Sequence, residues 1–175
     1  DNEWLGNSLN GMHRHPMAGY LRYENMFIQN WFVEKHGWDA VGRLWNDCDY
    51  GEDPFQTYMR TRMEGTKEEK INQLADEMWE WGARMTTYDF ESIRELGKNS
   101  INRRKQTALT KQSAGFWSPT KADCIENYGN NAIQLNVPVA GRTVYAEFVG
   151  QAGREGYTAH NVTKAGWKYG FVALL

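Results

Sequence analysis

Hydrophobic residues recur at helical spacing in the first half of the chain and alternate with polar residues in its last third. From Tyr20 to Lys35 the apolar positions form two adjoining stripes, a pattern typical of a helix that is buried on most of its surface. Gly37 is expected to adopt the left-handed conformation that ends this helix. Asp39 is placed to cap a short helix over 40–45. The pattern predicts a long buried helix that turns sharply into a shorter one.

Two further helices are predicted from their capping residues. Asp53 followed by Pro54 is typical of a helix start, and this helix is expected to reach about Met63. Thr66 and Glu69 have the spacing of a capping box, in which each side chain bonds the other residue's backbone. Apolar residues then continue at helical spacing over 71–85, so the longest helix is expected to begin here.

Glycine and aspartate positions complete the helical part. Gly82 lies inside the longest predicted helix, where glycine costs about 1 kcal/mol relative to alanine, so we expect close contact with a neighbouring helix there. Asp89 is placed to cap one more short helix, which Gly97 is expected to end. Residues 1–97 are therefore predicted to form a helical subdomain.

After this subdomain the composition changes. Residues 98–118 are rich in basic residues and poor in apolar ones, which indicates a solvated connector. Alternation over 132–137 and 143–149, with a turn between them, predicts an antiparallel hairpin. Two more strands are expected, at 157–162 and 167–175.

The predicted fold class is therefore α+β: a helical subdomain, a connector and a small antiparallel β-sheet over residues 119–175. Four strands suit part of a β-sandwich or jelly-roll-like domain. The last strand is apolar on both faces up to its final residue, so we expect the β subdomain to be truncated.

Composition narrows the classes of partner. Of the 175 residues, 41% are hydrophobic and 14% aromatic, enough for one good core or two small ones. The net charge of -2 argues against nucleic acid, whose binding needs a basic excess. No apolar run is long enough to span a membrane. Cys48 and Cys124 form one disulfide or remain two free buried thiols, and the sequence leaves both alternatives open.

Few residues suggest metal or acid–base chemistry. His13 and His15 would point to one face of a strand, and Glu24 lies in the aromatic helix; these three are weak candidates for metal ligands. Exposed or hydrogen-bonded histidines and a polar helix face explain them more simply. The acidic loop over 47–53 lacks the spacing of an EF-hand, which favours a solvated loop.

Sequence motifs of hydrolases and nucleotide-binding enzymes are missing. The chain contains no HExxH, GxSxG, P-loop or dinucleotide-binding GxGxxG sequence, so no catalytic residue is assigned. Trp167 and Tyr169 alternate along the last predicted strand and are weak candidates for ligand binding, because such rings stack on sugars. Packing in a core explains these two aromatic residues equally well.

Three stretches carry a resemblance to a known family: YENMFIQNWFVEKHGWDAVGRLW, EDPFQTYMR and ADEMWEWGARMTTYDFESIRELG. They resemble the region that follows the HExxH centre in secreted, gluzincin-like zinc metallopeptidase-like proteins of unknown function, common in Bacteroidetes. The family's R-x-x-x-x-D element corresponds to Arg84 and Asp89. Because the HExxH helix is missing from this chain, the family's catalytic residues cannot be carried over.

The resemblance implies a non-catalytic C-terminal portion of a larger secreted or cell-surface protein, with a structural or substrate-positioning role. Its partner would be the upstream catalytic region, with a glycan or protein substrate, and zinc would be bound by the parent protein and not by this chain. The alternative is a carbohydrate- or cell-surface-binding module that uses exposed aromatic residues. An intact metal-dependent hydrolase ranks third, since no motif places a general base or nucleophile.

Overall fold

The computed structural model describes residues 12, 16–17, 27–101, 106–126, 128–137, 139–150 and 167–173. Within these residues the chain has an α+β fold, with helices first and a two-stranded antiparallel sheet after them, as predicted. The elements are α2 (Phe27–His36), α3 (Asp39–Asn46), α4 (Pro54–Arg62), α5 (Lys67–Thr87), α6 (Arg94–Ser100), β1 (Leu109–Lys111), η3 (Ser113–Gly115), β2 (Trp117–Pro119) and η4 (Lys121–Asp123).

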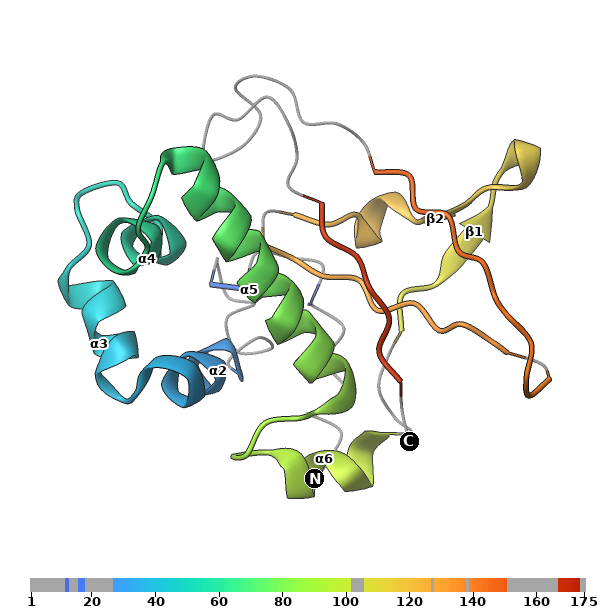
Figure 1. Cartoon of the computed structure of the whole chain (residues 1–175), viewed down its shortest axis with the longest axis horizontal. Coiled ribbons are helices and arrows are strands. Elements are labelled where there is room, and N and C mark those ends of the chain that lie inside the picture. Colours follow the sequence, from blue (N-terminus) through green and yellow to red (C-terminus); the bar gives the residue numbers. More distant parts are fainter. Residues whose placement is uncertain are drawn as a thin grey trace.

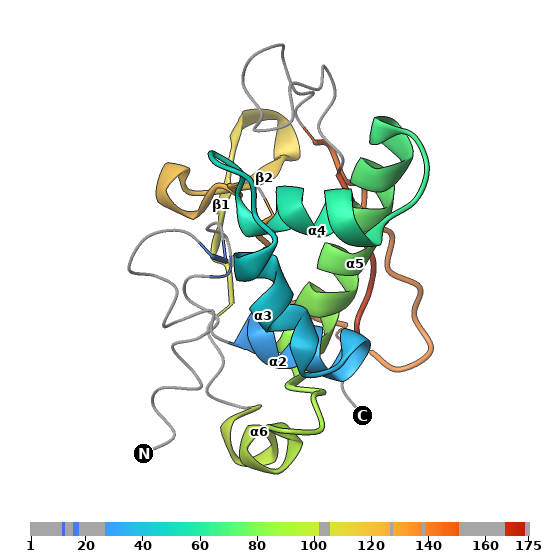
Figure 2. The ribbon, with the colours of Figure 1, turned by 90° about the vertical axis from the view of Figure 1, so that its left-hand side faces the viewer.

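Helix α5 divides the molecule (Figure 1). Helices α2, α3 and α4 lie on one side of it, and the strand pair and the extended segments of the last third lie on the other. The view from the side of α3 agrees, because the segment 167–173 lies behind α5 there (Figure 2). The helical part and the β part therefore share α5 as their common support.

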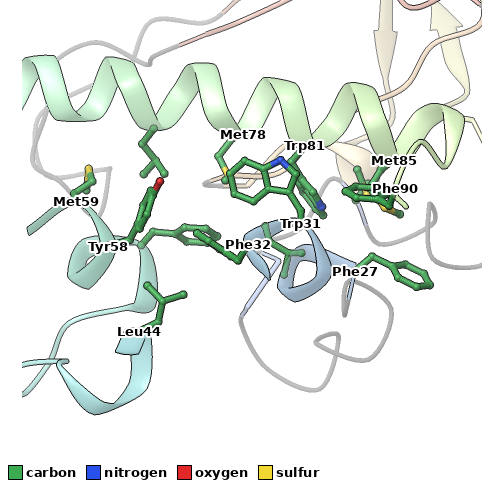
Figure 3. Packing of buried hydrophobic residues seen from close by; sticks show 14 of the residues in the cluster. Phe27, Trp31, Phe32, Leu44, Tyr58, Met59, Met78, Trp81, Met85 and Phe90 are labelled. Carbon is green, nitrogen blue, oxygen red and sulfur yellow. The ribbon is translucent and has the colours of Figure 1, made fainter. Parts of the chain in front are cut away.

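The hydrophobic core lies between α5 and the helices α2 and α4 (Figure 3). Trp31 and Phe32 from α2 and Trp81 from α5 are each fully buried, with 0% of their surface exposed. Phe32 contacts the ring of Tyr58 edge-on at a centroid distance of 5.2 Å. Fully burying an aliphatic or Phe side chain stabilises a fold by roughly 1.5–3 kcal/mol, and the larger indoles bury more, so this aromatic cluster is the main support of the helical part.

The predicted N-cap at Asp53 and the predicted capping box at Thr66 are confirmed, and the structure shows a capping box at both helix starts. The Asp53 carboxylate accepts hydrogen bonds from the backbone N–H of Phe55 at 2.8 Å and of Gln56 at 2.9 Å, and α4 begins at Pro54. Glu69 accepts from the backbone N–H of Thr66 at 2.7 Å, at the start of α5. These bonds satisfy N–H groups that a helix start leaves without a partner.

Two predicted aspartate caps are wrong. Helix α3 begins at Asp39 itself, and this side chain pairs with Arg43 one turn later at 2.9 Å. Asp89 likewise pairs with Arg94 at 2.8 Å, and α6 begins only at Arg94, without a side-chain cap. In both places an arginine within reach competes for the carboxylate that would otherwise cap the helix.

The glycine predictions have mixed outcomes. Gly37 adopts the left-handed conformation, with a φ of 89°, as predicted for a helix end. Gly97 does not end a helix but lies inside α6, where its missing side chain leaves room for Tyr88. Gly82 does make a close contact, but with Asn130 from a loop and not with another helix.

The antiparallel ladder lies in a different place from the predicted hairpin. It pairs Leu109 with Pro119, which is mostly within the predicted connector. A turn does form where predicted, because the N–H of Arg142 bonds the carbonyl of Val139 at 3.3 Å. The described residues on its two sides, 132–137 and 143–149, follow extended paths in Figure 1 but form no ladder. Alternation reports which way side chains face, and it does not require backbone pairing.

Two further predictions concern the cysteines and membranes. Cys48 and Cys124 are both free and exposed, so neither the disulfide nor the pair of buried thiols is found. Among the described residues, no helix has the length and apolar character needed to cross a membrane. The predicted strand 157–162 lies outside the described residues.

Candidate functional site

The sequence candidates Trp167 and Tyr169 lie together on an exposed aromatic surface. Phe148 joins them: its ring stacks on Tyr169 at a centroid distance of 5.1 Å and meets Trp167 edge-on at 5.7 Å. The three residues, here called the aromatic face, are 45%, 38% and 69% exposed for Phe148, Trp167 and Tyr169. The predicted alternative of core packing is therefore wrong for Tyr169, whereas Trp167 is the more covered of the two rings.

Helix α5 holds the segment that carries Trp167 and Tyr169. Lys168 pairs with Asp76 on α5 at 2.8 Å, and Gly170 lies against the ring of Trp79, also on α5. Side chains alternate along an extended backbone, so Lys168 and Gly170 turn toward the helix while their odd-numbered neighbours turn away. Trp167 and Tyr169 are thus exposed on the side of the segment that faces away from α5.

A polar cluster that the sequence did not reveal joins α2, α4 and α5. The Tyr58 hydroxyl donates to Glu77 at 2.6 Å, and its oxygen lies 2.7 Å from Nε2 of His36. Since the one tyrosine proton goes to Glu77, His36 must donate through Nε2–H. Burial, followed by the Glu77 hydrogen bond, raises the pKa of Tyr58 above its ordinary value. Tyr58 therefore keeps its proton at neutral pH, and the cluster connects three helices.

This cluster predicts a loss of stability in mild acid. Burial lowers the pKa of His36 below its ordinary value of 6.5, although Glu77 and Glu80 act the other way and Lys35 and Arg62 act with it. The unfolded chain therefore binds the proton first as the pH falls. The His36 contribution is fully present above pH 6.5 and is lost as the pH falls through the folded-state value.

Urea unfolding between pH 7.5 and 5.5 measures this effect. The native chain should lose free energy of unfolding over this window, and His36→Gln, which retains a donor for Tyr58, should lose less. Parallel pH profiles for the two proteins would contradict the prediction. Glu52 does not contribute to the change in stability over this pH range, because Arg60 holds the pKa of that carboxyl at about 2.

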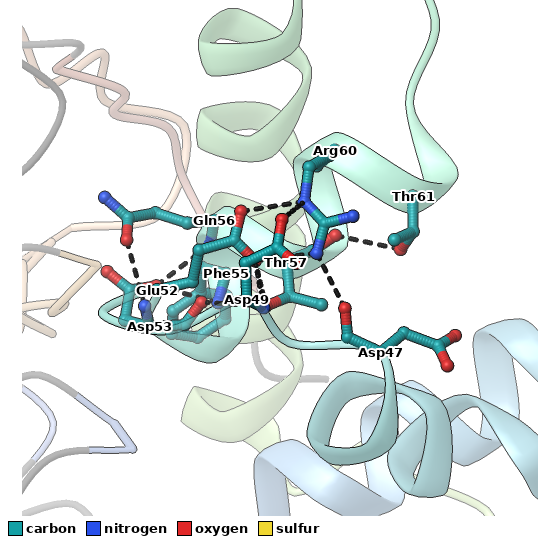
Figure 4. A network of polar contacts seen from close by, with 9 residues as sticks. All are labelled: Asp47, Asp49, Glu52, Asp53, Phe55, Gln56, Thr57, Arg60 and Thr61. Carbon is teal, nitrogen blue, oxygen red and sulfur yellow. Dashed lines mark hydrogen bonds and ion pairs between the residues drawn. The ribbon is translucent and has the colours of Figure 1, made fainter.

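The acidic loop before α4 is organised by Arg60 (Figure 4). Its guanidinium binds both carboxylate oxygens of Glu52 at 2.8 Å and donates to the carbonyl of Asp47 at 2.6 Å. The hydroxyl of buried Thr57 donates to Glu52 at 2.9 Å. The predicted solvated loop is thus pinned to α4, and its central carboxylate is already paired. Within the part of the chain that the structure describes, no group of three acidic, histidine or cysteine residues is arranged to hold a metal.

The remaining sequence candidates are not brought together. Arg84 pairs with Glu80 at 3.3 Å and lies 3.6 Å from Glu34, while the Asp89 side chain pairs elsewhere. The two side chains of the R-x-x-x-x-D element are therefore not paired with each other. His13, His15 and Glu24 lie outside the described residues.

Sequence reasoning missed the polar cluster around Tyr58 and the network around Arg60 for the same reason. Tyr58 and Glu77 are 19 residues apart, and their bond depends on how α4 packs against α5. No local spacing signals such a contact. A weak signal existed for Arg60, the basic residue that follows the acidic loop on the next helix.

Comparisons with known proteins give one match. No curated protein and no solved structure matches the chain. The sequence does match, over residues 2–175, a family described as a family of unknown function, DUF6055. A match over nearly the whole length identifies the family, and the chain belongs to DUF6055, the family of unknown function.

Proposed function

We propose that this chain is a carbohydrate-binding module that holds sugar rings on its aromatic face. The observation that carries the proposal is the grouping of three exposed rings: Trp167 and Tyr169, on a segment that contacts α5, and Phe148, which packs against both. Exposed indole and phenol rings offer a flat apolar surface together with a polar edge, which suits the apolar face and the hydroxyls of a pyranose. Single exposed apolar residues are common on protein surfaces, whereas a group of exposed rings often marks a binding site.

Charge favours a neutral sugar over an anionic ligand. The nearest cation in the segment, Lys168, is already paired with Asp76. The chain carries a net charge of -2 and therefore gives no general attraction for phosphate or nucleic acid. A neutral glycan of a cell surface or wall is the ligand that these groups match.

Isothermal titration with cellohexaose, xylohexaose and chitohexaose tests the proposal. The double variant Trp167→Ala/Tyr169→Ala should lower the affinity for at least one of these sugars about tenfold or more, since truncating central aromatic residues has large effects. Trp117→Ala is a matched control, because Trp117 is 59% exposed but lies on β2. Absence of binding by the native protein to all three sugars would contradict the proposal.

A second candidate function is a structural or substrate-positioning part of a larger secreted, zinc-peptidase-like protein. It is supported by the three stretches that resemble the region after the HExxH centre of such proteins, which include Arg84 and Asp89. In such a protein the neighbouring catalytic region would hold the zinc.

Zinc titration tests this second candidate against an intact metal-dependent hydrolase. We expect zinc affinity weaker than about micromolar, and we expect His13→Ala/His15→Ala to leave the melting temperature nearly unchanged, because no structural metal site is removed. One-to-one binding at submicromolar zinc, lost in the double variant, would instead favour the hydrolase.

A further inference from the structure

Helix α3 presents two exposed tryptophans on its outer side. Trp38, at the helix start, is 86% exposed, and Trp45 in the last turn is 55% exposed. The opposite side of the helix faces the core, where Ala40 and Leu44 are buried. Residues seven apart lie on one face of a helix, about 10 Å apart along its axis. The two indoles therefore border one surface.

Gly42 forms the floor of that surface. It lies four residues after Trp38 and three before Trp45, so it shares their face. A side chain placed there would meet nothing within 4 Å, unlike Gly82 and Gly97, whose missing side chains make room for neighbours. Glycine inside a helix costs about 1 kcal/mol relative to alanine, and here no packing contact explains that cost. A need for open space between the two indoles would explain why a glycine stands at this position.

The rim of this surface is polar and its charges are paired. Asp39 binds Arg43 at 2.9 Å, and the side chain of Asn46 donates to Asp47 at 3.2 Å. Arg62 also lies 3.8 Å from Asp39, so two basic side chains offset two acidic ones, and the rim supplies donors and acceptors without an excess of either charge. It therefore matches the hydroxyl groups of a neutral sugar better than a phosphate or a cationic peptide.

We propose that Trp38, Gly42 and Trp45 form a second binding site for a neutral glycan chain. The ligand class rests on the function proposed above, but the site is a different one. The axial distance between the indoles is comparable with the length of a disaccharide, so alternate rings of one chain can stack on them.

The two sites lie on opposite sides of α5 (Figures 1 and 2). A short oligosaccharide would occupy one site at a time, whereas a polymer or a dense glycan surface would engage both. Two linked sites raise the apparent affinity for such a surface well above that of either site alone. The substrate class is thus polymeric or densely displayed glycan.

Oxidation of tryptophan by N-bromosuccinimide, read by mass spectrometry of peptides, tests the site directly. Cellohexaose, xylohexaose and chitohexaose serve as probes, and at least one should slow the oxidation of Trp38 and Trp45 about threefold or more. Trp117 should be oxidised at an unchanged rate. Equal rates at Trp38 and Trp45 with and without all three sugars would overturn the inference.

Gly42→Gln separates binding from folding, because it fills the floor and leaves both indoles in place. This variant should keep or slightly raise its melting temperature, because glutamine forms helix better than glycine, and it should lose the protection. Trp38→Ala/Trp45→Ala should remove one of the two binding sites for the same sugar, seen as a lower stoichiometry in isothermal titration. If the Gly42→Gln variant keeps full protection, the inference fails even where Trp167→Ala/Tyr169→Ala confirms the first site. If protection grows with protein concentration without sugar, a second copy covers the face and the inference also fails.

Discussion

Replacing Trp81 by alanine is expected to lower the free energy of unfolding by about 3–5 kcal/mol, the largest effect of any single change considered for this chain. Trp81 is fully buried in the hydrophobic core between α5 and the helices α2 and α4. The change removes a large apolar surface from the core and leaves a cavity, and the surrounding rigid rings can collapse into it only in part. A domain of ordinary stability has about 5–15 kcal/mol in total, so much of it would be lost.

Urea unfolding followed by circular dichroism measures this loss. Trp79→Ala is a matched control, since Trp79 lies two residues away on the same helix and is 39% exposed. It should cost only about 1 kcal/mol. Equal losses for the two variants would show that the core does not centre on Trp81, and the packing in Figure 3 would then have to be reconsidered.

The sequence predicted the helices well wherever a local signal sets them. The N-cap at Asp53 and the capping box at Thr66 were predicted from residues at most three positions apart, because both partners of each bond lie within one turn. The same local rule failed at Asp39 and Asp89. There the carboxylate has a second partner four or five residues on, and propensity alone does not decide between a cap and an ion pair.

Prediction was weaker in the last third of the chain. Alternating residues placed Trp167 and Tyr169 on one face of an extended segment, but they left open whether these rings are exposed or packed in a core. They did not indicate which strands pair, since pairing depends on partners distant in the sequence. Phe148 entered the aromatic face for the same reason: only the packing against Tyr169 brings it there.

Gly97→Ala is the last prediction, and its sign opposes the usual effect of this substitution. Gly97 is buried inside α6, and an added Cβ would collide with the Cβ of Tyr88 and lie 3.0 Å from its Cγ. Tyr88 cannot easily move, because it is fully buried and ends α5 in the left-handed conformation with a φ of 53°. We therefore expect a loss of about 1–3 kcal/mol, typical of overpacking.

The matched control is Gly42→Ala, the same substitution in a helix with open space around it. There alanine should raise the free energy of unfolding by about 0.5–1 kcal/mol, because it restores helix propensity and meets no neighbour. Thermal and urea unfolding of the two variants should thus move in opposite directions from the native protein. A gain in stability for Gly97→Ala would mean that the side chain of Tyr88 can move away from α6, and the overpacking argument would be wrong.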